Sequence, residues 1–333
     1  MRSYLSRPVP FLLHPASKDY LWGGTRLNDD FSKRIASDIV AETWECSTHP
    51  DGVSIASSGE WIGMPLNEIL HAHPEYLGEH ARGSTELPVL VKFIDAKRDL
   101  SVQVHPSDEF AREHENGQNG KTEMWYVMQA DKDAELVMGF NREMTRMDYV
   151  NVLKNNTLQS VLNHEQVKKN DVYFIPAGRV HALGPGIMVA EIQQTSDTTY
   201  RIYDWDRIDV AGMRRELHVQ QSVEAIDGTM PEKFKTEVPD VMNKTVSVVD
   251  CQYFVTNLLQ LQGEMEKDYS NLDSFVILMP LEGFFALHWE NGAVFVKAGE
   301  CVLIPNVIKK VAIRAEQYCK LLEIYCQIED SEF

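Results

Sequence analysis

The sequence predicts a mainly β fold of the sandwich, jelly-roll or barrel type. Short apolar segments recur along the chain, separated by Gly, Asn, Asp and Pro, as in proteins built from many short strands. Helical periodicity is scarce, and a faint internal repeat relates two parts of the chain. Together these three observations favour a β architecture with a duplicated unit.

The individual elements follow from local patterns. A Pro near the first turn predicts a helix over 65–77, and apolar residues near helical spacing predict a second one over 144–162. Apolar runs bounded by turn residues predict the strands 88–94, 124–128, 134–140, 171–175, 188–193, 275–279, 283–288 and 319–325.

The internal repeat consists of three matches in the same order along the chain. They pair 125–128 with 274–277, 169–176 with 298–305, and 189–192 with 321–324. Such patterns also recur by chance in β proteins, but three in order favour a duplication. His181 follows the Pro of the first copy, whereas the second copy has no His there. We therefore expect one active copy and one structural partner.

The composition is that of an ordinary folded protein and excludes some classes of partner. The 333 residues include 32 Lys and Arg against 50 Asp and Glu, a formal net charge of −18. A length of this order predicts about two domains. The acidic balance argues against nucleic acid and against an anionic membrane surface. A small anionic substrate is still compatible, because the charge of a pocket can oppose that of the whole protein.

The cysteines and the first residues predict a cytoplasmic protein. The five Cys are odd in number and form no Cys-x-x-Cys pair, which indicates a reducing compartment. Residues 1–8 lack the apolar core of a signal peptide. No run of about 18 apolar residues is present, so we expect no membrane span.

Three short segments carry the residues that could perform chemistry. In 100–108, Ser101, Gln103 and His105 alternate with Val and would share one face of a strand, which lines a site or is simply solvated. Lys121 and Glu123 are likewise two residues apart. The Gly120-Lys121-Thr122 sequence is not a phosphate-binding loop, because Glu115 stands where that motif has Gly and a strand follows it.

Two histidines and a carboxylate are suitable ligands for zinc or a similar divalent cation. His105, Glu123 and His181 have the required donor types, and Gln103 is a further candidate. Each lies on a different predicted strand, so their spacing in sequence is weak evidence. The other nine histidines are expected to be ordinary surface or core residues.

Several motifs in order resemble the class I mannose-6-phosphate isomerases, in their shorter bacterial form. They are Trp22-Gly23-Gly24, Ala41-Glu42-Thr43-Trp44-Glu45, Lys92 eleven residues before Gln103, Ser101-Val102-Gln103-Val104-His105-Pro106, Lys121-Thr122-Glu123-Met124-Trp125-Tyr126, Gly178-Arg179-Val180-His181-Ala182, and Glu191 with Arg201. The specific motifs cover about residues 8–210. Unlike the larger members of the family, this chain has little or no helical insertion between Glu123 and His181.

The resemblance implies two cupin-type jelly-roll barrels with a few helices. Residues 1–235 would form the catalytic domain and 236–333 a cupin-like domain without metal ligands. It further implies a zinc-dependent interconversion of mannose 6-phosphate and fructose 6-phosphate. By that resemblance His105, Glu123 and His181 are zinc ligands with Gln103 as a fourth, Arg201 is the active-site arginine, and Lys92, Ser101, Lys121 and Glu191 face the substrate.

An aldose–ketose isomerisation moves a proton between C2 and C1 through an enediol, so it needs a base and a means of stabilising negative charge. Glu191 is the first candidate for the base, with Lys121 or a zinc-bound hydroxide as alternatives. Arg201 offers a fixed positive charge. The candidates for holding the phosphate are Lys92, Arg98 and Lys121. The sequence does not decide between these candidate bases, and it does not predict the oligomeric state.

Two other functions fit part of the pattern. A different metal-dependent cupin enzyme, such as an iron oxygenase, also uses two His and one carboxylate. The cations Lys92, Lys121 and Arg201 argue against it, because an oxygenase has no general need for them. A non-catalytic sugar-phosphate sensor would keep the metal for folding, but no DNA-binding or partner domain is evident.

Overall fold

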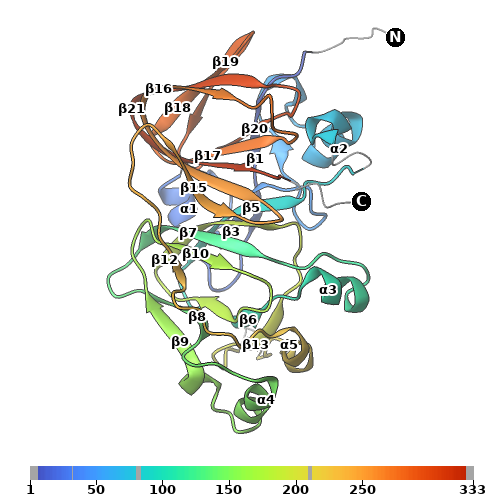
Figure 1. Ribbon diagram of the computed structural model, residues 1–333, viewed down its shortest axis with the longest axis vertical. Coiled ribbons are helices and arrows are strands. Elements are labelled where there is room, and N and C mark those ends of the chain that lie inside the picture. Colours follow the sequence, from blue (N-terminus) through green and yellow to red (C-terminus); the bar gives the residue numbers. More distant parts are fainter. Residues whose placement is uncertain (1–6, 32, 80–83, 209–211, 328–333) are drawn as a thin grey trace.

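The computed structural model describes residues 7–31, 33–79, 84–208 and 212–327, and its regular structure is mainly strand (Figure 1). The described strands form three sheets, while the helices are short and peripheral. The mainly β prediction is confirmed. Residues 1–6 of the segment that argued against a signal peptide lie outside the described residues. In the part of the chain that the structure describes, no helix is long and apolar enough to cross a membrane.

A seven-stranded sheet forms the middle layer (Figure 1). Its order is β14 (Lys235–Thr236), β10 (Val172–Ile175), β7 (Glu123–Ala130), β12 (Ile187–Gln194), β5 (Val89–Ala96), β3 (Glu42–Cys46) and β2 (Ala16–Lys18). All its neighbouring strands are antiparallel.

A five-stranded sheet lies on one side of the middle layer. Its order is β13 (Tyr200–Tyr203), β6 (Val102–Val104), β11 (His181–Leu183), β8 (Glu135–Phe140) and β9 (Leu162–Gln166). Trp125, Val127 and Val189 of the middle sheet pack against Leu136 and Met138 of this one. The outer face of the five-stranded sheet is covered by α4 (Arg146–Lys154) and α5 (Val219–Ala225).

A nine-stranded sheet on the other side holds the C-terminal strands. Its central order is β15 (Thr245–Asp250), β16 (Val255–Asp268), β21 (Lys310–Tyr325), β17 (Val276–Glu282), β20 (Cys301–Ile304), β1 (Phe11–His14) and β4 (Ile55–Ala56), with β18 (Phe284–Trp289) and β19 (Gly292–Lys297) attached. The N-terminal strand β1 pairs with β20, with Leu12 opposite Val302.

The repeat in the sequence corresponds to a repeat in strand order. Strands β10, β7, β12 and β5 are neighbours in that order, and β20, β17, β21 and β16 are neighbours in the same way. The three matched segments of the sequence thus occupy matching places in two sheets. The arrangement into two barrels and the division at 235/236 stay predictions.

The predicted helices differ from the observed ones mainly in length. The remaining helices are α1 (Arg26–Asp29), α2 (Leu66–Ala72) and α3 (Asp108–His114), with short 3-10 turns at Gly59–Trp61, Pro74–Tyr76 and Leu158–Val161. The helix expected over 144–162 ends at Lys154. Asn156 has a positive φ of 54°, which an α-helix cannot accommodate, so the chain turns there before the 3-10 segment. Strand β21 begins nine residues before the predicted 319.

Alternation along the strands determines what faces the space between the middle and five-stranded sheets. On β7, Met124 and Tyr126 contribute to the core shared with the C-terminal sheet, so Glu123 and Trp125 point the other way. On the five-stranded sheet, Val102 and Val104 contact the outer core and leave Gln103 facing inward. Polar side chains from the two sheets therefore meet at one end of an otherwise apolar layer.

Candidate active site

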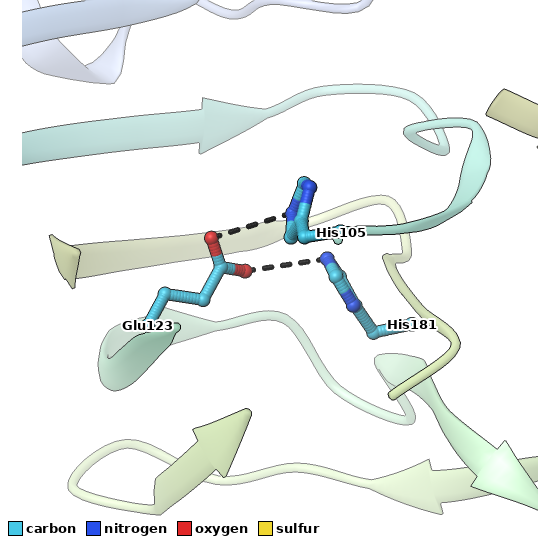
Figure 2. A group of neighbouring side chains, drawn as sticks. All are labelled: His105, Glu123 and His181. Carbon is cyan, nitrogen blue, oxygen red and sulfur yellow. Dashed lines mark ion pairs between the residues drawn. The ribbon is translucent and has the colours of Figure 1, made fainter. Parts of the chain in front are cut away.

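Three buried ligand-type side chains converge at that end. Glu123 begins β7, His181 begins β11, and His105 directly follows β6 (Figure 2). One possible ligand atom from each residue lies within 4.8 Å of the others. The Glu123 carboxylate reaches both rings, with Oε2 at 3.5 Å from His105 Nε2 and Oε1 at 3.2 Å from His181 Nε2. The structure thus brings together the three residues predicted to bind metal.

The two imidazoles are oriented by the backbone. Nδ1–H of His105 donates to the Thr198 carbonyl at 3.0 Å, and Nδ1–H of His181 donates to the Arg179 carbonyl at 2.9 Å. Because each Nδ1 carries the proton, the lone pair of each Nε2 points into the group. Burial lowers the pKa of His181 to about 4 and also holds the pKa of His105 well below its ordinary value. Neutral imidazoles of this kind are the form that binds a metal.

The unused bonding capacity of this group fits a divalent cation. His105 Nε2 and Glu123 Oε1 are buried and have no hydrogen-bond partner among the described residues, while Glu123 Oε2 pairs with Lys121 at 3.0 Å. Buried polar atoms are rarely left in that state unless a ligand or ion satisfies them. The Gln103 carboxamide, whose Nε2 is 3.3 Å from His181 Nε2, adjoins the group and could supply a fourth donor. Two imidazoles, one carboxylate and one amide oxygen suit zinc and similar metals.

A row of buried, alternating charges runs from the metal-type group across the middle sheet. Lys121 Nζ lies 3.0 Å from Glu123 Oε2 and 4.0 Å from Glu191 Oε1. Lys92 Nζ lies 3.3 Å from Glu191 Oε1 and 3.6 Å from Glu42 Oε2. Trp125 Nε1 donates to the other oxygen of Glu191 at 2.7 Å. Each lysine therefore already has carboxylates on both sides.

These pairings control the charge states of the row. Burial raises the pKa of Glu191, but Lys121 and Lys92 outweigh it and keep the pKa below its ordinary value. Burial would lower the pKa of Lys92, and the carboxylates of Glu42 and Glu191 reverse this and raise it. The pKa of Glu123 rises to about 7, because it is fully buried and faces Glu191. A positive ion beside Glu123 would favour its ionised form.

A cavity of about 240 Å³ opens beside this row. Its lining contains every predicted substrate-facing residue, namely Lys92, Ser101, Lys121, Glu191 and Arg201. Arg201 is on β13, directly opposite Gln103 of β6, which places it beside the metal-type group. Arg98, suggested above as a phosphate ligand, is exposed and does not belong to this lining.

Four titratable lining residues were missed by the sequence analysis as site residues. They are Tyr20, Glu42, Asp197 and Arg215. Glu42 lies in one of the quoted motifs, and the two-residue alternation with Trp44 could have placed it on the inner face of a strand. The other three come from loops, where no periodic pattern reveals the direction of a side chain. A larger hollow of about 720 Å³ adjoins the cavity through Asp197 and Thr199, and its lining includes Asp51, Glu86 and Glu115 but, among the described residues, no lysine or arginine.

The fold and this site define a cupin-type β protein with a place for a metal ion beside a polar, cation-lined cavity. A sequence model of the family "Phosphomannose isomerase type I, catalytic domain" matches residues 11–142. The mannose-6-phosphate isomerase ManA of Bacillus subtilis (strain 168) is 35% identical over 314 residues, which are 93% of this chain and 97% of that protein. A mannose-6-phosphate isomerase of Streptococcus mutans is 34% identical over 90% of this chain and 93% of its own length.

Solved structures agree with these relatives. The crystal structure of the mannose 6-phosphate isomerase from Bacillus subtilis superimposes with a TM-score of 0.86 at 32% identity, covering 95% of this chain and 99% of that one. The chain therefore belongs to the type I phosphomannose isomerase family. The resemblance seen in the motifs is confirmed.

Proposed function

We propose that this protein is a zinc-dependent isomerase that interconverts mannose 6-phosphate and fructose 6-phosphate. The observation that carries the proposal is the juxtaposition, at one cavity, of the His105, Glu123 and His181 group with the buried Glu191 and Arg201. Family membership supports the same reaction. The expected partner is a small sugar phosphate.

Zinc would be held by His105, Glu123, His181 and Gln103. When bound, it would supply a Lewis acid that stabilises negative charge on the substrate oxygens. The support for this ligand set is the fixed direction of both Nε2 lone pairs and the buried Glu123 Oε1, which accepts no hydrogen bond from any described residue.

The protein residues would move the proton. Glu191, ionised and lining the cavity, is the proposed base that takes the proton from C2 and returns it to C1 of the enediol. The oxygen at C1 gains a proton as the one at C2 loses it, so the isomers balance. Arg201 would stabilise the negative charge, since its Nε is buried without a hydrogen-bond partner among the described residues. Lys92, Lys121 and Ser101 would orient the sugar, with Lys121 the alternative base.

We also propose that residues 1–235 carry the catalysis and that 236–333 form a second, cupin-like unit without metal ligands. In support, all residues that line the cavity fall between Tyr20 and Arg215. The C-terminal strands cover the opposite face of the middle sheet.

A coupled assay for fructose 6-phosphate formed from mannose 6-phosphate tests the proposal. Activity should be lost on chelation and restored by zinc. Absence of product with zinc fully loaded would overturn the reaction. Bound zinc without turnover would keep the metal site and direct attention to another sugar phosphate or to a sensor. An iron oxygenase is disfavoured because Lys92, Lys121 and Arg201 line the cavity.

A further inference from the structure

The segment that follows β13 pairs two arginines with one carboxylate, and a third arginine on β13 lies close enough to feel its charge. Asp204 is only 6% exposed. Arg215 donates to it twice, from Nε to Oδ2 at 2.8 Å and from Nη2 to Oδ1 at 2.5 Å. Arg207 Nη2 donates to the same Oδ1 at 2.7 Å. Arg201, three residues before Asp204, completes the set, which we call the arginine cluster (Arg201, Arg207 and Arg215).

The arginine cluster carries more positive charge than its neighbours neutralise. Arg201 donates from Nη1 to the backbone carbonyl of Glu216, which carries no charge, and its own pKa is lowered by burial and then by Arg215. The Glu216 side chain belongs to a solvent-exposed residue, so water screens its carboxylate. In a protein with a net charge of −18, a local cationic excess of this kind favours an anionic ligand.

The lysines of the cavity are poorly suited to the same task. Lys92 lies between Glu42 and Glu191, and Lys121 lies between Glu191 and Glu123. Both are at most 4% exposed. A phosphate dianion placed there would meet these carboxylates as well as the ammonium groups. The arginines are in a different position. The strongest charges that act on Arg201 come from other arginines and from two carboxylates that do not line the cavity.

The two ends of the cavity also match the two ends of a hexose 6-phosphate. Arg201 is opposite Gln103 in the sheet, next to the metal-type group. Arg215 lines the same cavity from the loop and its side chain is 39% exposed, which places it at the open end. C1 and C2, where the reaction occurs, are at the other end of the sugar from the phosphate on C6.

We propose that Arg215 binds the phosphate of the substrate at the open end of the cavity, and that Asp204 and Arg207 are positioning residues that hold its guanidinium in place. Arg201 lies between this phosphate and the reacting carbons. The inference rests on the proposed function and gives its phosphate specificity a location. A planar guanidinium with a fixed orientation is well suited to paired hydrogen bonds with phosphate oxygens.

The test compares Arg215→Gln with the matched control Arg214→Gln. Arg214 is 63% exposed, forms an ion pair with Asp206 and does not line the cavity. Loss of a charge-assisted contact predicts an increase of about 10- to 100-fold in KM for mannose 6-phosphate in Arg215→Gln. Its kcat should be largely retained, and Arg215→Lys should be intermediate. Arg214→Gln should behave as wild type.

A binding measurement separates this inference from the isomerase proposal. The zinc-loaded proteins are titrated calorimetrically with sorbitol 6-phosphate, which carries the phosphate but no carbonyl. Wild type and Arg214→Gln should bind it, and Arg215→Gln should bind it at least about tenfold more weakly. If wild type isomerises mannose 6-phosphate but Arg215→Gln keeps its KM and its affinity for the probe, the inference is wrong and the isomerase stands. If wild type neither turns over the substrate nor binds the probe, both fail.

Discussion

Glu191 and Glu323 occupy matching positions in the two copies of the repeat, yet Glu191 lines the cavity beside the metal-type group and Glu323 does not. Glu191 lies on β12 opposite Lys92 and lines the cavity, with Lys92 at 3.3 Å and Lys121 at 4.0 Å from one of its oxygens. Glu323 lies on β21 opposite Asn257. Its oxygens accept hydrogen bonds from Asn257 at 2.9 Å and Tyr269 at 2.7 Å, and Lys267 lies 2.8 Å away.

The difference is between a carboxylate that we propose acts on a ligand and one that we expect to serve stability. Both residues are at most 3% exposed, so burial alone does not distinguish them. What distinguishes them is that Glu191 lines a cavity, whereas both oxygens of Glu323 accept hydrogen bonds from the side chains packed around it. A buried network without a cavity fixes one packing arrangement, whereas a carboxylate that lines a cavity can also reach a ligand.

The largest effect should come from removing a metal ligand on the cavity side. His181→Ala removes one of the two oriented imidazoles, and activity should fall to the background of the assay because charge stabilisation by the metal is lost. Metal content after dialysis should fall with it. His288→Ala, in the C-terminal sheet, is the control and should retain both. A His181→Ala protein that kept its zinc and its rate would contradict the assigned site.

The next effect separates the two glutamates by activity. Glu191→Gln should lower kcat by about 10²–10⁴-fold, the usual contribution of a general base. Its stability should change little, since Lys92 keeps Glu42 and Lys121 keeps Glu123. Steady-state kinetics and urea unfolding measure the two effects. An active but unstable Glu191→Gln protein would make both glutamates structural.

Glu323→Gln should show the reverse behaviour. It leaves the largely buried Lys267 without its countercharge, and loss of one partner of a buried pair costs about 3 kcal/mol. We expect that decrease in the free energy of unfolding, with kcat unchanged. Glu264→Gln, in an exposed pair with Arg314, should cost no more than about 1 kcal/mol. Equal decreases in the free energy of unfolding for Glu323→Gln and Glu264→Gln would contradict the structural role assigned to Glu323.

The smallest effect concerns a single hydrogen bond. Trp125→Phe removes the N–H that donates to Glu191 and should lower kcat about tenfold by letting the carboxylate move. Trp289→Phe is its control, because that indole N–H has no partner among the described residues. Matching kinetics for the two variants would show that Trp125 does not position Glu191.

Alternation along strands accounts for most of what the sequence could predict. The two-residue spacing of Ser101, Gln103 and His105 correctly indicated a shared polar face, because the Val residues between them enter the outer core. The order of the repeat correctly indicated matching sheets, since each match is a local strand pattern. The mainly β class followed from the same signals.

Interactions between distant segments could not be predicted in this way. Lys92 and Lys121 were candidate phosphate ligands because the sequence shows their charge but not the glutamates that surround them. Arg215 and Asp197 lie in loops, where no periodicity gives a direction. The pairing of β1 with β20 joins residues that are far apart in the sequence, and no local pattern predicts it.

That pairing has a consequence for biosynthesis. Leu12 and Val302 are neighbours across the sheet but 290 positions apart in the chain. At a translation rate of about 5–20 residues per second, roughly 15–60 s pass between the synthesis of β1 and that of β20. Until then its backbone edge is open to other strands, as is typical of sites where chaperones act. A strand synthesised much later thus covers the open edge of β1.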